Sequence, residues 1–171
     1  PVRHTGMMIN GYARASASGT RLFEILDIEP AVRDKPEAPD LVLKGGVLRF
    51  EDVRFAYRDD AGDHDVVSNI SFEVHPGETV GIVGPPGSGK STIAHLLPRF
   101  YDVTGGRITI DGQDIRDVTL ESLRNAVGIV QQDTFLFTAP IERNVAYGEP
   151  SADNDRIAAA TDSAQLHDYV V

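Results

Sequence analysis

The sequence between residues 84 and 91 reads Gly84-Pro85-Pro86-Gly87-Ser88-Gly89-Lys90-Ser91 and fits the pattern G-x-x-x-x-G-K-[ST]. Glycines in such a loop let the backbone turn tightly, so that its N–H groups can lie against phosphate oxygens. The Lys90 ammonium can reach the β- and γ-phosphates of a nucleotide, and the Ser91 hydroxyl can bind Mg²⁺. A glycine-rich turn with a solvated lysine is the simpler alternative. We predict a phosphate-binding loop.

The segments on either side of this loop support that prediction. Residues 79–83 form a short apolar run typical of a buried strand. Residues 89–100 carry Ile93, Leu97 and Phe100 at helical spacing. A loop that joins a strand to a helix leads into unpaired N–H groups at the start of the helix, and these groups favour anions.

The N-terminal part of the sequence indicates a helix followed by a linker. Apolar residues recur at steps of three and four between residues 5 and 28, and Pro30 stops the pattern. Residues 29–44 hold three prolines among charged residues, a composition typical of linkers. We favour the tail of a preceding domain over an amphipathic helix that packs on its own domain. Both ends of the sequence look like cuts in a longer protein.

From residue 46 the hydrophobic pattern becomes that of strands. Val53, Phe55 and Tyr57 alternate with polar or small residues, and residues 66–74 form a second apolar run. Strands that alternate with helices imply an α/β core with parallel pairing, whereas the closely spaced strands before residue 79 suggest an antiparallel layer. Further elements are predicted as strands at 107–110 and 127–130 and as helices that begin near Thr119, Pro140 and Ser151.

The composition excludes several classes of function. The 171 residues suit one domain, and 26 acidic against 16 basic residues give a net charge of -10, which argues against a nucleic-acid partner. There is no cysteine for a disulfide or a Cys-based zinc site, and the five histidines show no spacing typical of metal ligands. No apolar run approaches the roughly 18 residues of a membrane span, and no signal peptide is recognisable.

Seven short stretches carry a family resemblance that covers nearly the whole chain. They lie at residues 53–57, 76–78, 84–92, 99–102, 110–112, 130–137 and 144–148. Together they resemble the nucleotide-binding domain of ABC transporters, of the exporter type in which the membrane and ATPase domains share one chain. The resemblance implies a P-loop NTPase core with a mostly parallel sheet, an antiparallel β subdomain and the start of a helical subdomain.

The resemblance also implies roles for individual residues toward ATP and Mg²⁺. Tyr57 matches the aromatic residue that stacks on adenine, although it could instead be a core aromatic. Gln132 matches the glutamine that binds Mg²⁺ and senses the γ-phosphate; Gln131 competes for that role, and we prefer Gln132 because Asp133-Thr134-Phe135 follows it directly. Thr92 and the eight loop residues would bind the nucleotide, Ser91 and Gln132 the metal, and Lys90 and Gln132 would act in catalysis.

The expected partners follow from the same resemblance. Residues 133–144 resemble the surface that meets the coupling helices of the transmembrane domain, and a second nucleotide-binding domain would complete a homodimer or a heterodimer. The sequence departs from the usual pattern at Ala139-Pro140 and in the order of Glu142-Arg143, which puts the geometry of that surface in doubt. The phosphate loop is not affected by either departure.

The implied organisation places the chain at the cytoplasmic face of a membrane, the inner or plasma membrane if bacterial, within an integral membrane protein. Residues 1–29 would be the cytoplasmic end of a transmembrane-domain helix, residues 30–45 a linker, and residues 46–171 the N-terminal part of the ATP-binding domain. The signature, Walker B and switch motifs of the family would follow Val171. We therefore predict that the intact protein hydrolyses ATP and that this fragment does not. A nucleotide-binding regulatory module and a small-molecule kinase are the alternatives.

Overall fold

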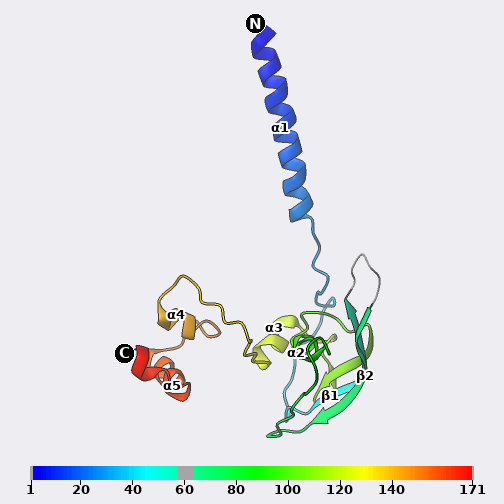
Figure 1. Ribbon diagram of the computed structural model, residues 1–171, viewed down its shortest axis with the longest axis vertical. Coiled ribbons are helices and arrows are strands. Elements are labelled where there is room, and N and C mark those ends of the chain that lie inside the picture. The colour runs from blue at the N-terminus through cyan, green and yellow to red at the C-terminus, as the bar shows by residue number, and fades with distance from the viewer. Residues whose placement is uncertain (1, 58–63, 171) are drawn as a thin grey trace. The chain divides into compact units, whose positions relative to one another are not determined.

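A computed structural model describes residues 2–57 and 64–170 of the chain (Figure 1). The chain forms two compact units, Pro1–Gly128 and Ile129–Val171, and each is described by itself. The first unit contains the sheet and the phosphate loop. The second contains short helices joined by irregular segments.

Helix α1 spans Val2–Leu26, close to the predicted range of 5–28. Its last turn closes with a 2.8 Å hydrogen bond from the Asp27 N–H to the Phe23 carbonyl, before Pro30 is reached. The apolar side chains of Tyr12, Leu22 and Phe23 are exposed. Among the described residues, no helix has both the length and the apolar character that crossing a bilayer requires.

A four-stranded sheet forms the first unit's framework, with the order β2-β1-β3-β4 (Figure 1). Its strands are β1 (Leu48–Tyr57), β2 (His64–Val74), β3 (Gly105–Ile110) and β4 (Gln113–Asp114), and every pairing is antiparallel. The Asp111-Gly112 turn predicted from the sequence joins β3 to β4, with φ of 50° and 80° at the two residues. Positive φ at both positions suits a tight hairpin, which explains the choice of Asp-Gly.

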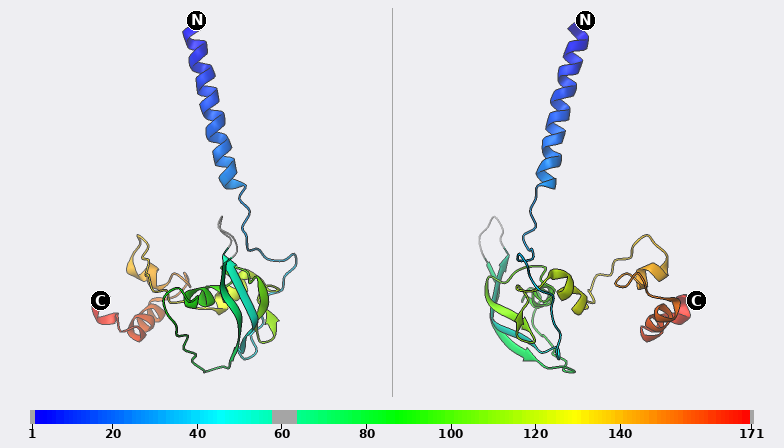
Figure 2. Two further views of the ribbon diagram at one scale, coloured as in Figure 1. Left: turned by 45° about the vertical axis from the view of Figure 1, so that its right-hand side comes forward. Right: turned by 180° about the vertical axis from the view of Figure 1, so that it is seen from behind.

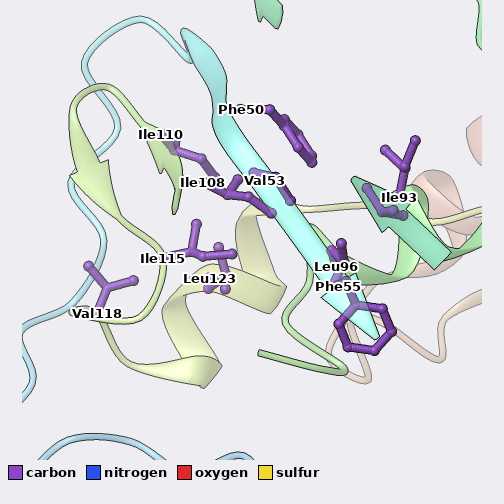
Figure 3. Close-up of a cluster of buried hydrophobic side chains, with 11 residues drawn as sticks. Phe50, Val53, Phe55, Ile93, Leu96, Ile108, Ile110, Ile115, Val118 and Leu123 are labelled. Atoms are coloured by element: carbon purple, nitrogen blue, oxygen red, sulfur yellow. The ribbon is translucent and has the colours of Figure 1, made fainter. Parts of the chain in front are cut away.

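The core lies where two short helices, α2 (Lys90–Leu96) and α3 (Leu120–Ala126), pack against the sheet (Figure 3). Val53, Leu96, Ile108 and Leu123 are completely buried, and each such side chain contributes about 1.5–3 kcal/mol relative to exposure. Thr119 caps α3, because its hydroxyl accepts a hydrogen bond from the Ser122 N–H, as the sequence predicted. The packing of α2 fixes the phosphate loop that precedes it.

The parallel strands predicted at 79–83 and 127–130 do not form in this structure. Both segments lack strand pairing, and the sheet of the described residues is antiparallel throughout. An extended apolar segment becomes a strand only when a neighbour satisfies its backbone groups, and neither segment has one here. Val83 and Val130 are accordingly almost fully exposed. The prediction of an antiparallel β layer is correct; a mostly parallel sheet is not shown.

The second unit contains α4 (Ile141–Val145), α5 (Asn154–Ser163) and α6 (His167–Val170). The Asp153 carboxylate accepts a hydrogen bond from the Arg156 N–H and caps α5, so this helix begins after Asp153 and Ser151, expected near its start, is not the cap. Asp153 lies directly before the first helical residue, where a side-chain oxygen can reach the free N–H groups. Figure 2 shows these helices from two further sides.

Candidate nucleotide-binding site

Gly89 sets the exit of the phosphate loop into α2. It is the N-cap of that helix and has a φ of 85°, in the left-handed region that favours glycine. A Cβ atom at this position would lie 2.7 Å from the Val66 carbonyl oxygen of β2. The loop therefore touches the neighbouring strand backbone here, and a side chain would push it away.

The Lys90 side chain folds back across the loop that precedes it. Its Nζ donates hydrogen bonds to the carbonyl oxygens of Gly84 at 2.9 Å and Pro85 at 2.8 Å, and it lies 3.4 Å from the Ser88 hydroxyl. The loop thus encircles a positive charge. A phosphate that entered the loop would meet this ammonium group, as the sequence predicted for Lys90.

The remaining loop residues differ in exposure. Residues 84–88 and Ser91 are exposed, so the backbone of the loop and the Ser91 hydroxyl are accessible to a ligand. Gly89 and Thr92 are buried, and Lys90 is half-buried. The structure therefore brings the eight residues of the motif and Thr92 together at one end of α2.

Tyr57 lies beside the first turn of that same helix. Its hydroxyl is 3.3 Å from the Thr92 hydroxyl, and either oxygen can act as the donor. Its ring meets Phe55 edge-on at 4.8 Å and Tyr101 edge-on at 5.2 Å between centroids. The Tyr57 residue is 37% exposed, so one part of it packs on the core and another part is open to a ligand.

A cavity of about 980 Å³ opens beside Tyr57. Ligand sites in proteins usually measure about 300–1,000 Å³. The cavity is lined by residues 30–32, 55–57 and 100–104 together with Leu120 and Arg124. The Arg124 guanidinium lies 5.7 Å from the centre of the Phe100 ring, within the range of a cation–π contact.

The sequence did not predict Tyr101, Arg124 or residues 30–32 as parts of a site. Residues 99–102 were recognised only as a stretch of family resemblance, without a role. Arg124 was seen only as the last residue of a short helix. Tyr101 comes from the loop that follows α2, and no spacing in the sequence indicates that this loop returns to β1.

Comparison with known proteins decides which family this geometry represents. The family model described as ABC transporter matches residues 67–170, which is more than half of the chain. The chain belongs to the ABC transporter family.

Two relatives of this ABC transporter chain are longer than the chain itself. It is 43% identical over its whole length to the heavy metal tolerance protein of Schizosaccharomyces pombe, of which it spans 20%. It is 42% identical to the ATP-dependent lipid A-core flippase of Desulfotalea psychrophila over 99% of this chain and 29% of the relative. The chain thus spans less than a third of the length of these relatives.

A solved structure supports the same assignment for the fold of the ABC transporter chain. The structure of a bacterial Atm1-family ABC exporter with ATP bound superposes with a TM-score of 0.87 and 43% sequence identity. The match covers 96% of this chain and 28% of that chain. The fold is therefore that of an ABC ATPase, a P-loop NTPase with an antiparallel β layer.

Gln132 of this ABC transporter chain belongs to the second unit. It is exposed, as is Gln131, and both lie in a segment without regular secondary structure. The first unit by itself holds Tyr57 and the phosphate loop but not this glutamine. The role of Gln132 toward the γ-phosphate and the metal therefore stays a prediction.

The residues expected to hold Mg²⁺ have the right chemistry for that ion. Ser91 offers a hydroxyl oxygen and Gln132 an amide oxygen, and Mg²⁺ prefers oxygen ligands together with phosphate oxygens and water. The exposed position of Ser91 leaves its hydroxyl accessible beside the loop. Each donor by itself has the chemistry that a magnesium ion requires, and their joint use for one ion stays a prediction.

Proposed function

We propose that this chain is the ATP-binding part of an ABC exporter, in which ATP binding and hydrolysis drive export of a substrate across a membrane. One observation carries the proposal. The Lys90 ammonium is held over the carbonyl oxygens of a glycine-rich loop, while Tyr57 contacts Thr92 in the next helical turn. In this proposal, the positive charge in the phosphate loop meets the phosphates and the aromatic ring beside the next helical turn meets the base.

Each residue of the site has a distinct task in this proposal. The backbone N–H groups of Gly84 and of residues 87–89 bind phosphate oxygens, since Pro85 and Pro86 have no N–H, and Lys90 exchanges its carbonyl partners for the β- and γ-phosphates. Tyr57 orients the base by stacking. Ser91 and Gln132 hold Mg²⁺. The bound ion neutralises the charge that develops on the phosphate oxygens during phosphoryl transfer.

The partners of the chain would be a second nucleotide-binding domain, as a homodimer or a heterodimer, and the coupling helices of a transmembrane domain. Phe135 and Leu136 are about three-quarters exposed, at 76% and 77%. Exposed apolar side chains in a row are typical of a protein interface, which supports residues 133–144 as the coupling surface. The chain would lie at the cytoplasmic face of the membrane that holds the intact protein.

Phosphoryl transfer requires more than phosphate binding, because a positioned water and stabilised transition-state charge are also needed. We expect those groups from the motifs that would follow Val171 in the intact protein. The intact protein is then an ATPase, and the 171-residue chain binds ATP without hydrolysing it. No partner of nucleic acid is expected, in keeping with the net charge of -10.

The test is a titration of the folded chain with a fluorescent ATP analogue in the presence of Mg²⁺. Lys90→Ala should abolish binding, because the triphosphate loses its main counter-charge. Lys44→Ala is the control, since Lys44 is an exposed lysine on the segment before β1, outside the phosphate loop. Equal binding by wild type and Lys90→Ala would contradict the proposed function.

A further inference from the structure

Residues 30–45, predicted to be a linker, form together with residues 46 and 47 a strap that is fastened along β4 and α3. The Leu41 N–H donates to the Ser122 hydroxyl at 2.8 Å. The main chain of Val42 both donates to and accepts from the side chain of Gln113, at 3.1 Å and 2.7 Å. In Figure 2 this segment runs along the unit between α1 and β1.

Asp111 anchors the C-terminal end of the strap. Its carboxylate accepts hydrogen bonds from the four successive N–H groups of residues 44–47, at 2.7–3.0 Å. These donors hold the pKa of the Asp111 carboxyl well below its ordinary value. The strap is therefore held to the β3–β4 hairpin by hydrogen bonds between its backbone N–H groups and a negatively charged carboxylate.

The N-terminal end of the strap is fixed as well. The Asp34 carboxylate accepts a 2.8 Å hydrogen bond from the Leu120 N–H. The Arg33 carbonyl accepts a 3.1 Å hydrogen bond from Arg99, whose side chain is almost completely buried. A buried donor of this kind sets the path of the chain where the strap begins.

This path brings residues 30–32 to the cavity beside Tyr57. Val32 is half-buried, and residues 30–32 and Tyr57 line the same cavity. Tyr57 also touches Thr92 in the first turn after the phosphate loop. Tyr57 is therefore the residue that links this cavity to the first turn after the phosphate loop.

We propose that residues 30–32 form one wall of the site for the nucleoside part of ATP, so that bound nucleotide and the attached strap stabilise each other. The inference rests on the proposed function, because it requires ATP at the phosphate loop. The aromatic rings of Tyr57 and Tyr101 suit a flat base, and the volume of about 980 Å³ accommodates a nucleoside. By thermodynamic linkage, the nucleotide strengthens attachment of the strap as much as the strap strengthens binding of the nucleotide.

The first experiment separates the nucleoside from the phosphates. Wild type, Val32→Asn and the control Val42→Asn are each titrated with ATP and with inorganic triphosphate in the presence of Mg²⁺. Val42 lies on the same strap as Val32, but its side chain is outside the cavity. Val32→Asn should weaken ATP binding about five-fold, a loss of about 1 kcal/mol, and leave triphosphate binding unchanged. Tyr57→Ala should show the same selective loss, and Val42→Asn should show none.

The second experiment needs no variant. Hydrogen exchange of the wild-type amides at residues 31–35 should slow by about five-fold or more with saturating ATP, and it should not slow with inorganic triphosphate. If ATP and inorganic triphosphate protected these amides equally, or if neither ligand protected them, the proposal that residues 30–32 line the nucleoside site would be overturned. The proposal for residues 30–32 would also be overturned if the ratio of ATP affinity to triphosphate affinity were the same in Val32→Asn and Val42→Asn. The proposed function would still stand in that case, provided that wild type binds ATP and Lys90→Ala does not.

Discussion

Gly89 shows how one residue can join a strand to a ligand loop. Its φ of 85° and the 2.7 Å approach of a virtual Cβ to the Val66 carbonyl oxygen exclude every side chain. The glycine pattern of the motif therefore has a packing cause in addition to its phosphate-binding one. The sequence revealed the glycine but not the strand that touches it.

Gly89→Ala should lower the free energy of unfolding more than a Gly→Ala change at another position with a left-handed backbone conformation. The left-handed conformation alone costs about 1–2 kcal/mol for a residue with a Cβ atom, and the contact with β2 adds to that cost. Gly77→Ala is the matched control, because Gly77 has a φ of 80° and open space around its Cβ position. Urea unfolding of both variants gives the comparison, and equal losses would show that the contact with Val66 has no energetic role.

At the scale of elements, the strap shows what sequence patterns miss. Three prolines among charged residues predicted correctly that no helix or strand forms between α1 and β1. They gave no sign that Leu41 and Ser122, which are 81 positions apart, are hydrogen-bonded. Composition indicates only the local conformational preference of a segment. Whether the strap is bound to α3 and β4 depends on hydrogen-bond partners that only the fold brings close to it.

The same reasoning explains which strands were predicted correctly. β1 and β2 follow each other along the chain, so their local patterns were sufficient to predict an antiparallel layer. β3 was predicted as a strand, but its pairing with β1 joins segments that are distant in the sequence, and no local pattern indicates it. The segments at 79–83 and 127–130 have the apolar composition of strands but no pairing partner among the described residues. Likewise, the phosphate loop was predicted residue by residue, whereas the cavity beside Tyr57 depends on distant segments.

Asp111→Asn should lower thermal stability at about pH 7 and have less effect at about pH 3. The folded-state pKa of Asp111 lies below its ordinary value of 3.8, so its stabilisation is present above that value. It is lost as the pH falls through the folded-state pKa, because the carboxylate that accepts four N–H groups becomes protonated. Thermal unfolding of wild type and variant across this pH range measures the difference, and Asp27→Asn, which changes an exposed aspartate just after α1, is the control. A stability loss independent of pH would contradict the charge argument.

At the scale of the whole molecule, α1 and the strap should contribute differently to the site. Removal of residues 1–26 should leave ATP affinity nearly unchanged, because α1 ends before the residues that line the cavity begin. Removal of residues 1–43 should weaken ATP binding while triphosphate binding persists, since residues 30–32 are then lost. Binding titrations, with circular dichroism to confirm folding of both shortened chains, provide the measurement. A large loss of affinity on removal of α1 alone would show that this helix belongs to the site.

The hydrogen bonds of the strap also determine how the chain responds to tension. A pull that arrives from α1 reaches Arg33 and Asp34 first, and these residues are tied to Arg99 and Leu120. Any load that passes them is shared with the bonds of Leu41 and Val42 and then with the four amides held by Asp111. Force would therefore enter the sheet and α3 in parallel instead of ending at a single hinge.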